Sequence, residues 1–279
     1  MAFYGEIITS SQNKFVSLAR SLGDKKHREK NGLFRFDGVK LMCEAIKRGV
    51  ELYFLLIAES AYDTVFQKAS SLYGIDGNSL NFKAVVVSDR LFEQISDENA
   101  PEGVICVAKY DLDRHRLLGE NDTISAEAEE KILLLESVRD PLNVGAIMRV
   151  AAAFGVDRVI MSRDCADIYN SKTVRASMGA VFALKTDRIE SISAAVERLK
   201  SSGRRVFAAA LDENAQRLGE LEIRKGDCVL IGNEGHGISK EAIDACDASV
   251  YIPMSDGVES LNAATAAAVL AWEFFGNCR

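Results

Sequence analysis

The chain has 279 residues, of which 48% are hydrophobic and 27% charged, and it contains only three prolines. This length suits two domains of ordinary size, and the apolar content can fill their cores, which excludes an intrinsically disordered protein. The formal net charge of −7 argues against a uniformly basic nucleic-acid-binding protein, although the charge is unevenly distributed along the chain.

The first 50 residues form a basic segment, with ten Lys and Arg against five Asp and Glu, whereas residues 51–130 carry six against sixteen. The basic side chains include the cluster Lys25, Lys26, His27, Arg28 and Lys30. Such a cluster can attract RNA phosphates through its local field even when the whole molecule is acidic. A solvated loop explains the cluster equally well.

Neither an export signal nor a metal site is indicated by the sequence. The start of the chain, Met1 to Lys14, lacks a basic segment followed by an apolar one, and no stretch approaches the roughly 20 apolar residues that cross a bilayer. We therefore expect a cytoplasmic protein. The six cysteines include no C-x-x-C pair and only three histidines are present, so reduced, buried thiols are expected rather than zinc or disulfides.

Strand-like and helix-like segments alternate through the first part of the chain, about residues 1–108. Strand patterns occur at 33–36, 52–58, 84–87 and 103–108, and helical patterns at 39–48, 63–73 and 89–95. This alternation predicts a small α/β domain with a mainly parallel sheet.

A linker is expected at residues 109–130, where apolar density falls and charge rises towards Glu127, Glu129 and Glu130. A second domain then covers residues 131–279. Its strand patterns, which alternate with helical segments, lie at 132–135, 158–161, 206–210, 228–231 and 250–252. They predict a second α/β domain with an open parallel sheet. Such sheets bind ligands in the loops after the carboxyl ends of their strands.

The first such loop, DPLNVGAIMR at residues 140–149, precedes a helix expected to run to Phe154. Asn143 stands where an N-cap belongs. Arg149 follows six residues later, and because helical side chains lean towards the N-terminus, its guanidinium could reach the mouth of the helix. A simple N-cap and a surface salt bridge would explain the same residues.

The second loop, Gly232 to Gly237, follows the strand at 228–231. Its three glycines allow a tight turn and a close approach of the backbone to a ligand, while Asn233 and Glu234 supply polar groups. The spacing is not the G-x-G-x-x-G of a dinucleotide-binding fold. His236 could be a general base, but an exposed turn histidine without a function is the favoured interpretation.

The third loop contains Ile252-Pro253-Met254 and then Ser260-Leu261-Asn262, which precede a helical segment at 263–275. Ser260 can cap this helix, whose N-terminus offers unpaired N–H groups. The small residues at 263–271 also fit a tightly packed core helix.

Together the three motifs, DPLNVGAIMR, IGNEGHGIS and YIPMSDGVESLN, resemble the SpoU or TrmH-like family of RNA ribose 2′-O-methyltransferases over residues 133–275. The segments KNGLFRFDGVKLMCEAIKRG and APEGVICVAK are similar to the substrate-binding domain that often precedes such catalytic domains. The resemblance implies a deep trefoil knot, a homodimer with its interface beside the cofactor site, and S-adenosylmethionine as the cofactor. It implies structured RNA as the substrate, with ribosomal RNA expected before transfer RNA.

The resemblance also implies the functional residues. The expected cofactor contacts are Gly232, Ile252, Leu261, Leu211 and Met254. The expected catalytic residues are Asn143, Arg149, Glu234, Ser260 and Asn262. No metal is expected.

Methyl transfer to a hydroxyl is an in-line displacement, so aligning the reactants removes much of the barrier. A guanidinium stays protonated in proteins, so we interpret Arg149 as an electrostatic clamp on the nascent alkoxide or an adjacent phosphate. The proton acceptor stays open between a phosphate oxygen, Glu234 and water. A base methyltransferase with the same fold is disfavoured by the N-x-G-x-x-x-R run, and a non-catalytic RNA-binding protein by the presence of Arg149, Glu234 and Asn262.

Overall fold

The computed structural model describes residues 6–75, 82–119, 122, 124, 129–212, 214–255, 257 and 260–276. The chain divides into two compact units. Unit 1 comprises the chain up to Asp111 together with Tyr169–Phe182, and unit 2 comprises Leu112–Ile168 and the chain from Ala183 onward. The chain therefore enters unit 1 twice. Glu127 of the expected linker and the sixth cysteine, Cys278, lie outside the described residues.

Unit 1 contains a four-stranded sheet of order β1-β4-β2-β3. The strands are β1 (Leu33–Asp37), β2 (Leu52–Ala58), β3 (Lys83–Val87) and β4 (Val104–Lys109). The expectation of a mainly parallel sheet is wrong, because β4 runs antiparallel to both β1 and β2 and only β2 and β3 pair in parallel. The connection from β1 to β2 leaves a gap one strand wide, which β4 fills from the opposite direction. Alternation of strand and helix patterns does not report strand direction.

The described N-terminal part of unit 1 also contains the helices α1 (Lys14–Ser21), α2 (Lys25–Asn31), α3 (Val39–Lys47), α4 (Tyr62–Tyr73) and α5 (Asp89–Glu93) and the short 3-10 helix η1 (Glu59–Ala61). The segment from α7 (Ser171–Ala176) to η3 (Ala180–Phe182) joins them from further along the chain. It is held in unit 1 by polar contacts such as Ser171 Oγ to Asp97 Oδ2, at 3.0 Å, and by the stacked rings of Tyr110 and Tyr169.

The basic cluster of the N-terminal segment lies on a helix, not on a loop. Helix α2 is capped by Asp24, which accepts a hydrogen bond from Lys26 N at 2.7 Å. Arg28 is only 3% exposed, and its guanidinium donates to the carbonyls of Leu22 and Gly23 at the end of α1, at 3.0 and 2.9 Å. Arg28 therefore joins the two helices and is not an accessible phosphate ligand.

Unit 2 contains an eight-stranded sheet of order β10-β12-β9-β11-β6-β7-β8-β5. Its strands are β5 (His115–Leu117), β6 (Ile132–Leu135), β7 (Arg158–Ser162), β8 (Lys185–Ile189), β9 (Val206–Ala209), β10 (Gln216–Arg217), β11 (Cys228–Ile231) and β12 (Ala248–Tyr251). All neighbouring strands pair in parallel, which confirms the predicted open parallel sheet. β5 lies inside the segment expected to be a linker.

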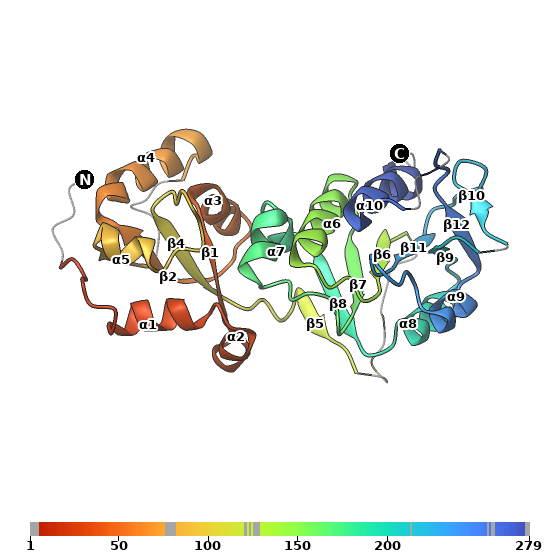
Figure 1. Ribbon diagram of the computed structural model, residues 1–279, viewed down its shortest axis with the longest axis horizontal. Helices are drawn as coiled ribbons and strands as arrows, with labels where there is room; N and C mark the ends of the chain where they lie inside the picture. Colours follow the sequence, from red (N-terminus) through yellow and green to blue (C-terminus); the bar gives the residue numbers. More distant parts are fainter. Residues whose placement is uncertain are drawn as a thin grey trace. The chain divides into compact units, whose positions relative to one another are not determined.

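Helices cover both faces of this sheet (Figure 1). Helices α6 (Pro141–Ala153) and α10 (Ala263–Ala271) pack together on one face, and α8 (Ile192–Ser201) and α9 (Lys240–Ala245) lie on the other. A π-helical turn, Trp272–Gly276, extends α10. From β6 the chain builds β7 and β8 on one side and later β9, β11 and β12 on the other. Open α/β sheets bind ligands where the direction of strand addition reverses in this way.

The thiols and the hydropathy of the described residues agree with a protein without disulfides or membrane-spanning helices in these parts of the chain. The five cysteines among them have free thiols, and four of these are buried. No helix in the described parts of the chain is long and apolar enough to span a bilayer.

Candidate active site

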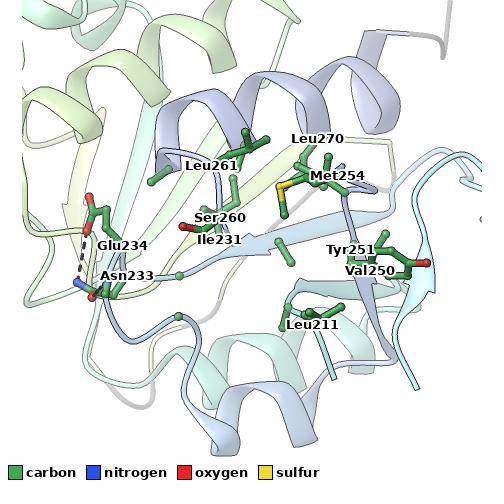
Figure 2. Close-up of a pocket in the computed structure, with 18 of the residues that line it drawn as sticks. Leu211, Ile231, Asn233, Glu234, Val250, Tyr251, Met254, Ser260, Leu261 and Leu270 are labelled. Atoms are coloured by element: carbon green, nitrogen blue, oxygen red, sulfur yellow. Dashed lines mark hydrogen bonds between the residues drawn. The ribbon is translucent and has the colours of Figure 1, made fainter. Parts of the chain in front are cut away.

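A pocket of about 850 Å³ opens at the carboxyl ends of β9, β11 and β12. This volume lies within the range of small-molecule sites. Figure 2 shows Asn233 and Glu234 at one end of the pocket and Leu211 and Tyr251 at the other. Among the described residues that line it, Glu234 alone is charged, whereas most of the remaining wall consists of Ala, Leu, Ile, Val and glycine. The pocket thus combines an apolar wall with one polar end.

The residues expected to contact the cofactor all line this pocket, namely Leu211, Gly232, Ile252, Met254 and Leu261. Leu211 is 81% exposed and Met254 is 41% exposed. Apolar side chains exposed at the rim of a cavity are typical of a ligand-binding surface. Their role in cofactor binding stays a prediction. Within the third motif, Asp256, Val258 and Glu259 lie outside the described residues.

Gly232 is required by the turn that it begins. A Cβ atom at this position would lie 2.4 Å from the carbonyl carbon of Gly237 and 2.5 Å from Ile238 N. The turn is closed by two backbone hydrogen bonds of 2.9 Å between Asn233 and Gly237. The steric demand on Gly232 therefore arises first from its own loop, and not only from a ligand as the sequence suggested.

Three predicted catalytic residues from three separate motifs form one hydrogen-bonded network. Asn143 Nδ2 donates to Glu234 Oε1 at 2.5 Å, and Asn143 Oδ1 accepts from Asn262 Nδ2 at 3.0 Å. The carboxamide of Asn143 thereby joins helix α6, the loop after β11 and the start of α10. The network fixes the Glu234 carboxylate at the polar end of the pocket.

Both helix caps differ from those expected. Asp140, not Asn143, caps α6, since it accepts from Leu142 N at 2.9 Å and Pro141 is the first helical residue. Asn143 lies in the first turn and is buried. The expectation of Asn143 as an N-cap is therefore wrong, and this leaves its side chain available for the network. Pro is favoured at the first position of a helix, so Asp140-Pro141 is the stronger start signal.

The cap of α10 is Asn262 and not Ser260. Asn262 Oδ1 accepts from Ala264 N at 2.9 Å while its Nδ2 donates to Asn143. Ser260 lines the pocket instead. The side chain of Asn262 thus caps α10 and also takes part in the predicted catalytic network.

The structure does not bring Arg149 into this network. Arg149 is exposed on α6, does not line the pocket and forms no hydrogen bond or ion pair with any described residue. Its guanidinium is therefore uncompensated by a carboxylate of the described chain. His236 is exposed too, and its backbone N–H donates to Asn233 Oδ1 at 3.0 Å.

A second layer of polar residues, which sequence reasoning missed, supports the loop of Glu234. Asn233 Nδ2 donates to the carbonyl of Ser137 at 2.8 Å, and Ser137 has a left-handed backbone with φ of 56°. Ser137 Oγ donates to Asp164 Oδ2 at 2.7 Å, and Ser162 Oγ donates to Asp164 Oδ1 at 2.6 Å. Asp164 follows β7 in a segment without a motif, so no sequence signal identified it.

The environment of Asp164 stabilises its carboxylate. Burial opposes ionisation, but hydrogen bonds from Ser162, Arg139 and Ser137 outweigh it and lower the pKa of Asp164 to about 2. The aspartate is ionised at neutral pH and holds Ser137 in its unusual conformation.

Two family models match the chain. The SpoU rRNA Methylase family matches residues 130–272, and the MRM3-like substrate binding domain matches residues 13–106. Among curated relatives, 23S rRNA (guanosine(2553)-2′-O)-methyltransferase RlmP of Bacillus subtilis is 28% identical over 96% of this chain and 99% of its own length. The 23S rRNA (uridine(2479)-2′-O)-methyltransferase of Streptomyces viridochromogenes is 28% identical over 95% and 90%.

Solved structures agree over nearly the whole chain. The AdoMet-bound rRNA methyltransferase from Sinorhizobium meliloti has a TM-score of 0.80 at 25% identity and covers 98% of each chain. The SpoU methyltransferase AviRb from Streptomyces viridochromogenes, in complex with AdoMet, has a TM-score of 0.79 at 25% identity and covers 95% of this chain and 98% of its own.

Proposed function

The chain belongs to the SpoU rRNA Methylase family and is an S-adenosylmethionine-dependent RNA ribose 2′-O-methyltransferase, and we propose that its substrate is structured ribosomal RNA. The observation that carries this proposal is the length of the match. Relatives named for methylating 23S rRNA align over at least 90% of both chains, so the resemblance includes the N-terminal part as well as the catalytic part. Transfer RNA is the alternative substrate.

The pocket fits S-adenosylmethionine, which supplies an electrophilic methyl group when bound. Leu211, Ile252, Met254 and Leu261 provide apolar contacts, and Gly232 places the backbone of its turn in the wall of the pocket. Because the charged and amide side chains gather at one end, we place the acceptor ribose near Glu234. The apolar wall leaves the remainder of the pocket for the body of the cofactor.

We assign orientation and proton handling to the network of Asn143, Glu234 and Asn262. The hydrogen bond from Asn143 restricts the Glu234 carboxylate, so that it can orient the ribose hydroxyl or accept its proton directly or through water. Ser260 lines the same pocket and offers a further hydroxyl for orientation. Alignment of this kind can remove up to roughly 7 to 11 kcal/mol of an activation barrier.

Arg149 is proposed to stabilise negative charge on the acceptor side. Since it lacks a carboxylate partner among the described residues, its charge is available to a ribose alkoxide or to the adjacent phosphate. A guanidinium suits this role because it presents planar, bidentate donors to oxyanions.

We further propose a trefoil-knotted homodimer in the cytoplasm. The knot is supported by the order of the strands, in which β11 enters between β9 and β6 after both have been formed. The dimer is supported by exposed apolar side chains, namely Leu142 on α6, Val269 on α10 and Trp272 in the π-helical turn that follows α10. Because Ala263, Ala266 and Leu270 of α10 line the pocket, an interface on these helices would lie beside the cofactor.

We propose that RNA binding belongs to an N-terminal domain, residues 1–108, joined by a linker at 109–130 to the methyltransferase domain at 131–279. The separation of the two family matches supports this division. The described structure adds that Tyr169–Phe182 clusters with unit 1.

Methylation of unmodified transcripts tests the proposal. We expect label from tritiated S-adenosylmethionine to enter an in vitro 23S rRNA transcript, and a single position to resist alkaline cleavage. Transfer RNA transcripts serve as the comparison. Label confined to transfer RNA would refute the ribosomal substrate, and label on a base would refute ribose methylation.

A further inference from the structure

A β-bulge in unit 1 exposes an aromatic side chain. The register between β2 and β4 shifts between Leu52 and Phe54, so Tyr53 is the additional residue in β2. Bulges of this kind re-aim side chains. The ring centroids of Tyr53 and Phe54 lie 5.7 Å apart, yet Tyr53 is 49% exposed while Phe54 is fully buried. The sheet thus presents a tyrosine ring to solvent next to its core.

Two lysines lie over the ring of Phe15, which contacts Phe54. Lys14 Nζ lies 5.2 Å and Lys83 Nζ 4.5 Å from the centroid of the Phe15 ring, which itself contacts Phe54 edge-on at 5.1 Å. Lys83 also pairs with Phe54 in the β2–β3 register. Both lysines are exposed, and neither forms an ion pair with any described residue. Their charges are held over an aromatic ring without being neutralised.

We propose that this surface, consisting of Lys14, Phe15, Tyr53 and Lys83 and here named the Tyr53 surface, binds an unpaired nucleotide of the substrate RNA. The proposal rests on the proposed function in RNA methylation. Tyr53 stacks on the base, and the two lysines contact the flanking phosphates. The exposed Tyr53 ring contacts Phe54, Phe54 contacts Phe15, and the two lysines lie over Phe15 without an ion-pair partner among the described residues. This combination of an exposed ring and cations matches a nucleotide, which has a planar base and negative charge. An acidic protein partner would use the lysines but would gain no stacking from Tyr53.

Part of the charge of the basic cluster on α2 is not available to RNA. Arg28 of that cluster is buried, and Lys25 is paired with Glu29 at 3.7 Å. The accessible, unpaired charge of α2 is therefore smaller than its sequence suggests, whereas Lys14 and Lys83 keep theirs. We accordingly place the base-stacking contact at the Tyr53 surface.

Binding to a fluorescently labelled, unmodified 23S rRNA transcript over a series of salt concentrations tests this proposal. Tyr53→Ala is expected to weaken binding about tenfold, and Tyr53→Phe to bind like the unaltered protein, because stacking needs the ring and not the hydroxyl. The double variant Lys14→Gln/Lys83→Gln is expected to lower the slope of log affinity against log salt by about 1.4, from two lost phosphate contacts. Cofactor affinity, measured on the same preparations, should be unchanged.

The matched control is Lys40→Gln/Arg90→Gln, which removes two exposed cations that follow the carboxyl ends of β1 and β3, whereas Lys83 begins β3. It is expected to leave affinity and salt slope unchanged. Equal losses in the control, or unaltered binding by both Tyr53→Ala and the lysine pair, would overturn the Tyr53 surface. Methyl transfer to the same transcript is measured separately, so that the binding surface and the proposed substrate are tested independently. If the unaltered protein binds the transcript without methylating it, the proposed substrate fails while the binding surface stands.

Discussion

Asn143 is the residue through which the three motifs meet, and its chemistry gives a test of the network. Asn143→Asp replaces the amide donor with a second carboxylate 2.5 Å from the Glu234 oxygen. We expect turnover to fall about 10- to 100-fold at neutral pH. Because two adjacent carboxylates raise one pKa of the pair, lowering the pH adds one proton and restores a donor. The activity of the variant relative to the unaltered enzyme should therefore rise as the pH falls.

The pH profile of turnover for both proteins measures this effect, with cofactor affinity as the control, since Asn143 does not line the pocket. A uniform loss of activity at every pH would mean that Asn143 only supports the fold.

Substitution of Arg149 tests whether this residue acts in methyl transfer or in cofactor binding. If it stabilises the developing alkoxide, Arg149→Ala loses contacts made mainly in the transition state, so turnover should fall by at least 100-fold with little change in cofactor affinity. Arg149→Lys should recover part of the loss, because lysine keeps the charge without the planar fork. Single-turnover kinetics and equilibrium binding provide the two measurements. Parallel losses of turnover and cofactor affinity would instead assign Arg149 to the cofactor site.

Ionisation of the Asp164 carboxyl group contributes to the free energy of unfolding. Its pKa is about 2 in the folded protein and about 3.9 when unperturbed, so its stabilising contribution is complete above pH 4 and is lost as the pH falls towards 2. Since the side chain is 43% exposed, we expect solvent screening to reduce this contribution to about 1 kcal/mol. Asp164→Asn should lower the free energy of unfolding by this amount at pH 7 and by much less near pH 2.

Chemical denaturation followed by circular dichroism at both pH values measures the difference. Arg139→Ala, which removes an exposed partner of Asp164, should have a smaller effect. An equal loss of stability at the two pH values would show that ionisation of Asp164 is not involved.

At the scale of elements, the turn after β11 offers a comparison between two glycines that both line the pocket. Gly232→Ala would place a Cβ atom 2.4 Å from the backbone of Gly237, whereas at Gly235 the nearest atom is Asn233 Oδ1 at 3.5 Å. We expect Gly232→Ala to distort the turn and weaken cofactor binding at least tenfold. Gly235→Ala should bind nearly normally.

Isothermal titration with S-adenosylmethionine measures both affinities, and the melting temperature reports whether the fold is retained. Normal cofactor binding by Gly232→Ala would mean that the loop can relax around the added methyl group.

Sequence patterns were sufficient to locate some of the helices and strands and failed to locate others. Apolar periodicity located the strands β2, β6 and β11 and helices such as α4 and α6, because buried strands and amphipathic helices have distinct spacings. It missed β8, since Asp187 in the middle of this strand is fully buried and its charge is satisfied by Arg116 and Arg158. A buried ion pair between strands is invisible to any pattern read within one strand.

The site was predictable in its composition but not in its contacts. The motifs identified Asn143, Glu234 and Asn262, yet their mutual hydrogen bonds depend on the packing of α6 against α10. The buried position of Arg28 depends likewise on the angle between two short helices. Tertiary arrangement decides such contacts, and residue spacing does not report it.

At the scale of the whole molecule, the proposed dimer gives a prediction about assembly. Trp272 is 55% exposed at the end of α10, and Trp272→Glu would place a charge within the proposed apolar interface. We expect the variant to be monomeric and to lose most of its activity. Leu72→Glu, on an exposed position of α4, is the matched control and should leave assembly unchanged. Light scattering after size-exclusion chromatography measures the mass, and an unaltered dimer of Trp272→Glu would exclude this interface.

The double passage of the chain through unit 1 restricts how the protein can be divided or recombined. Tyr169, Val181 and Phe182 are buried and cluster with unit 1, although the flanking strands β7 and β8 belong to unit 2. If the N-terminal part of unit 1 were replaced by that of a relative, residues 169–182 would stay behind. This segment would then pack against a surface with different side chains. An engineered exchange of unit 1 would therefore have to transfer two separate stretches of sequence together.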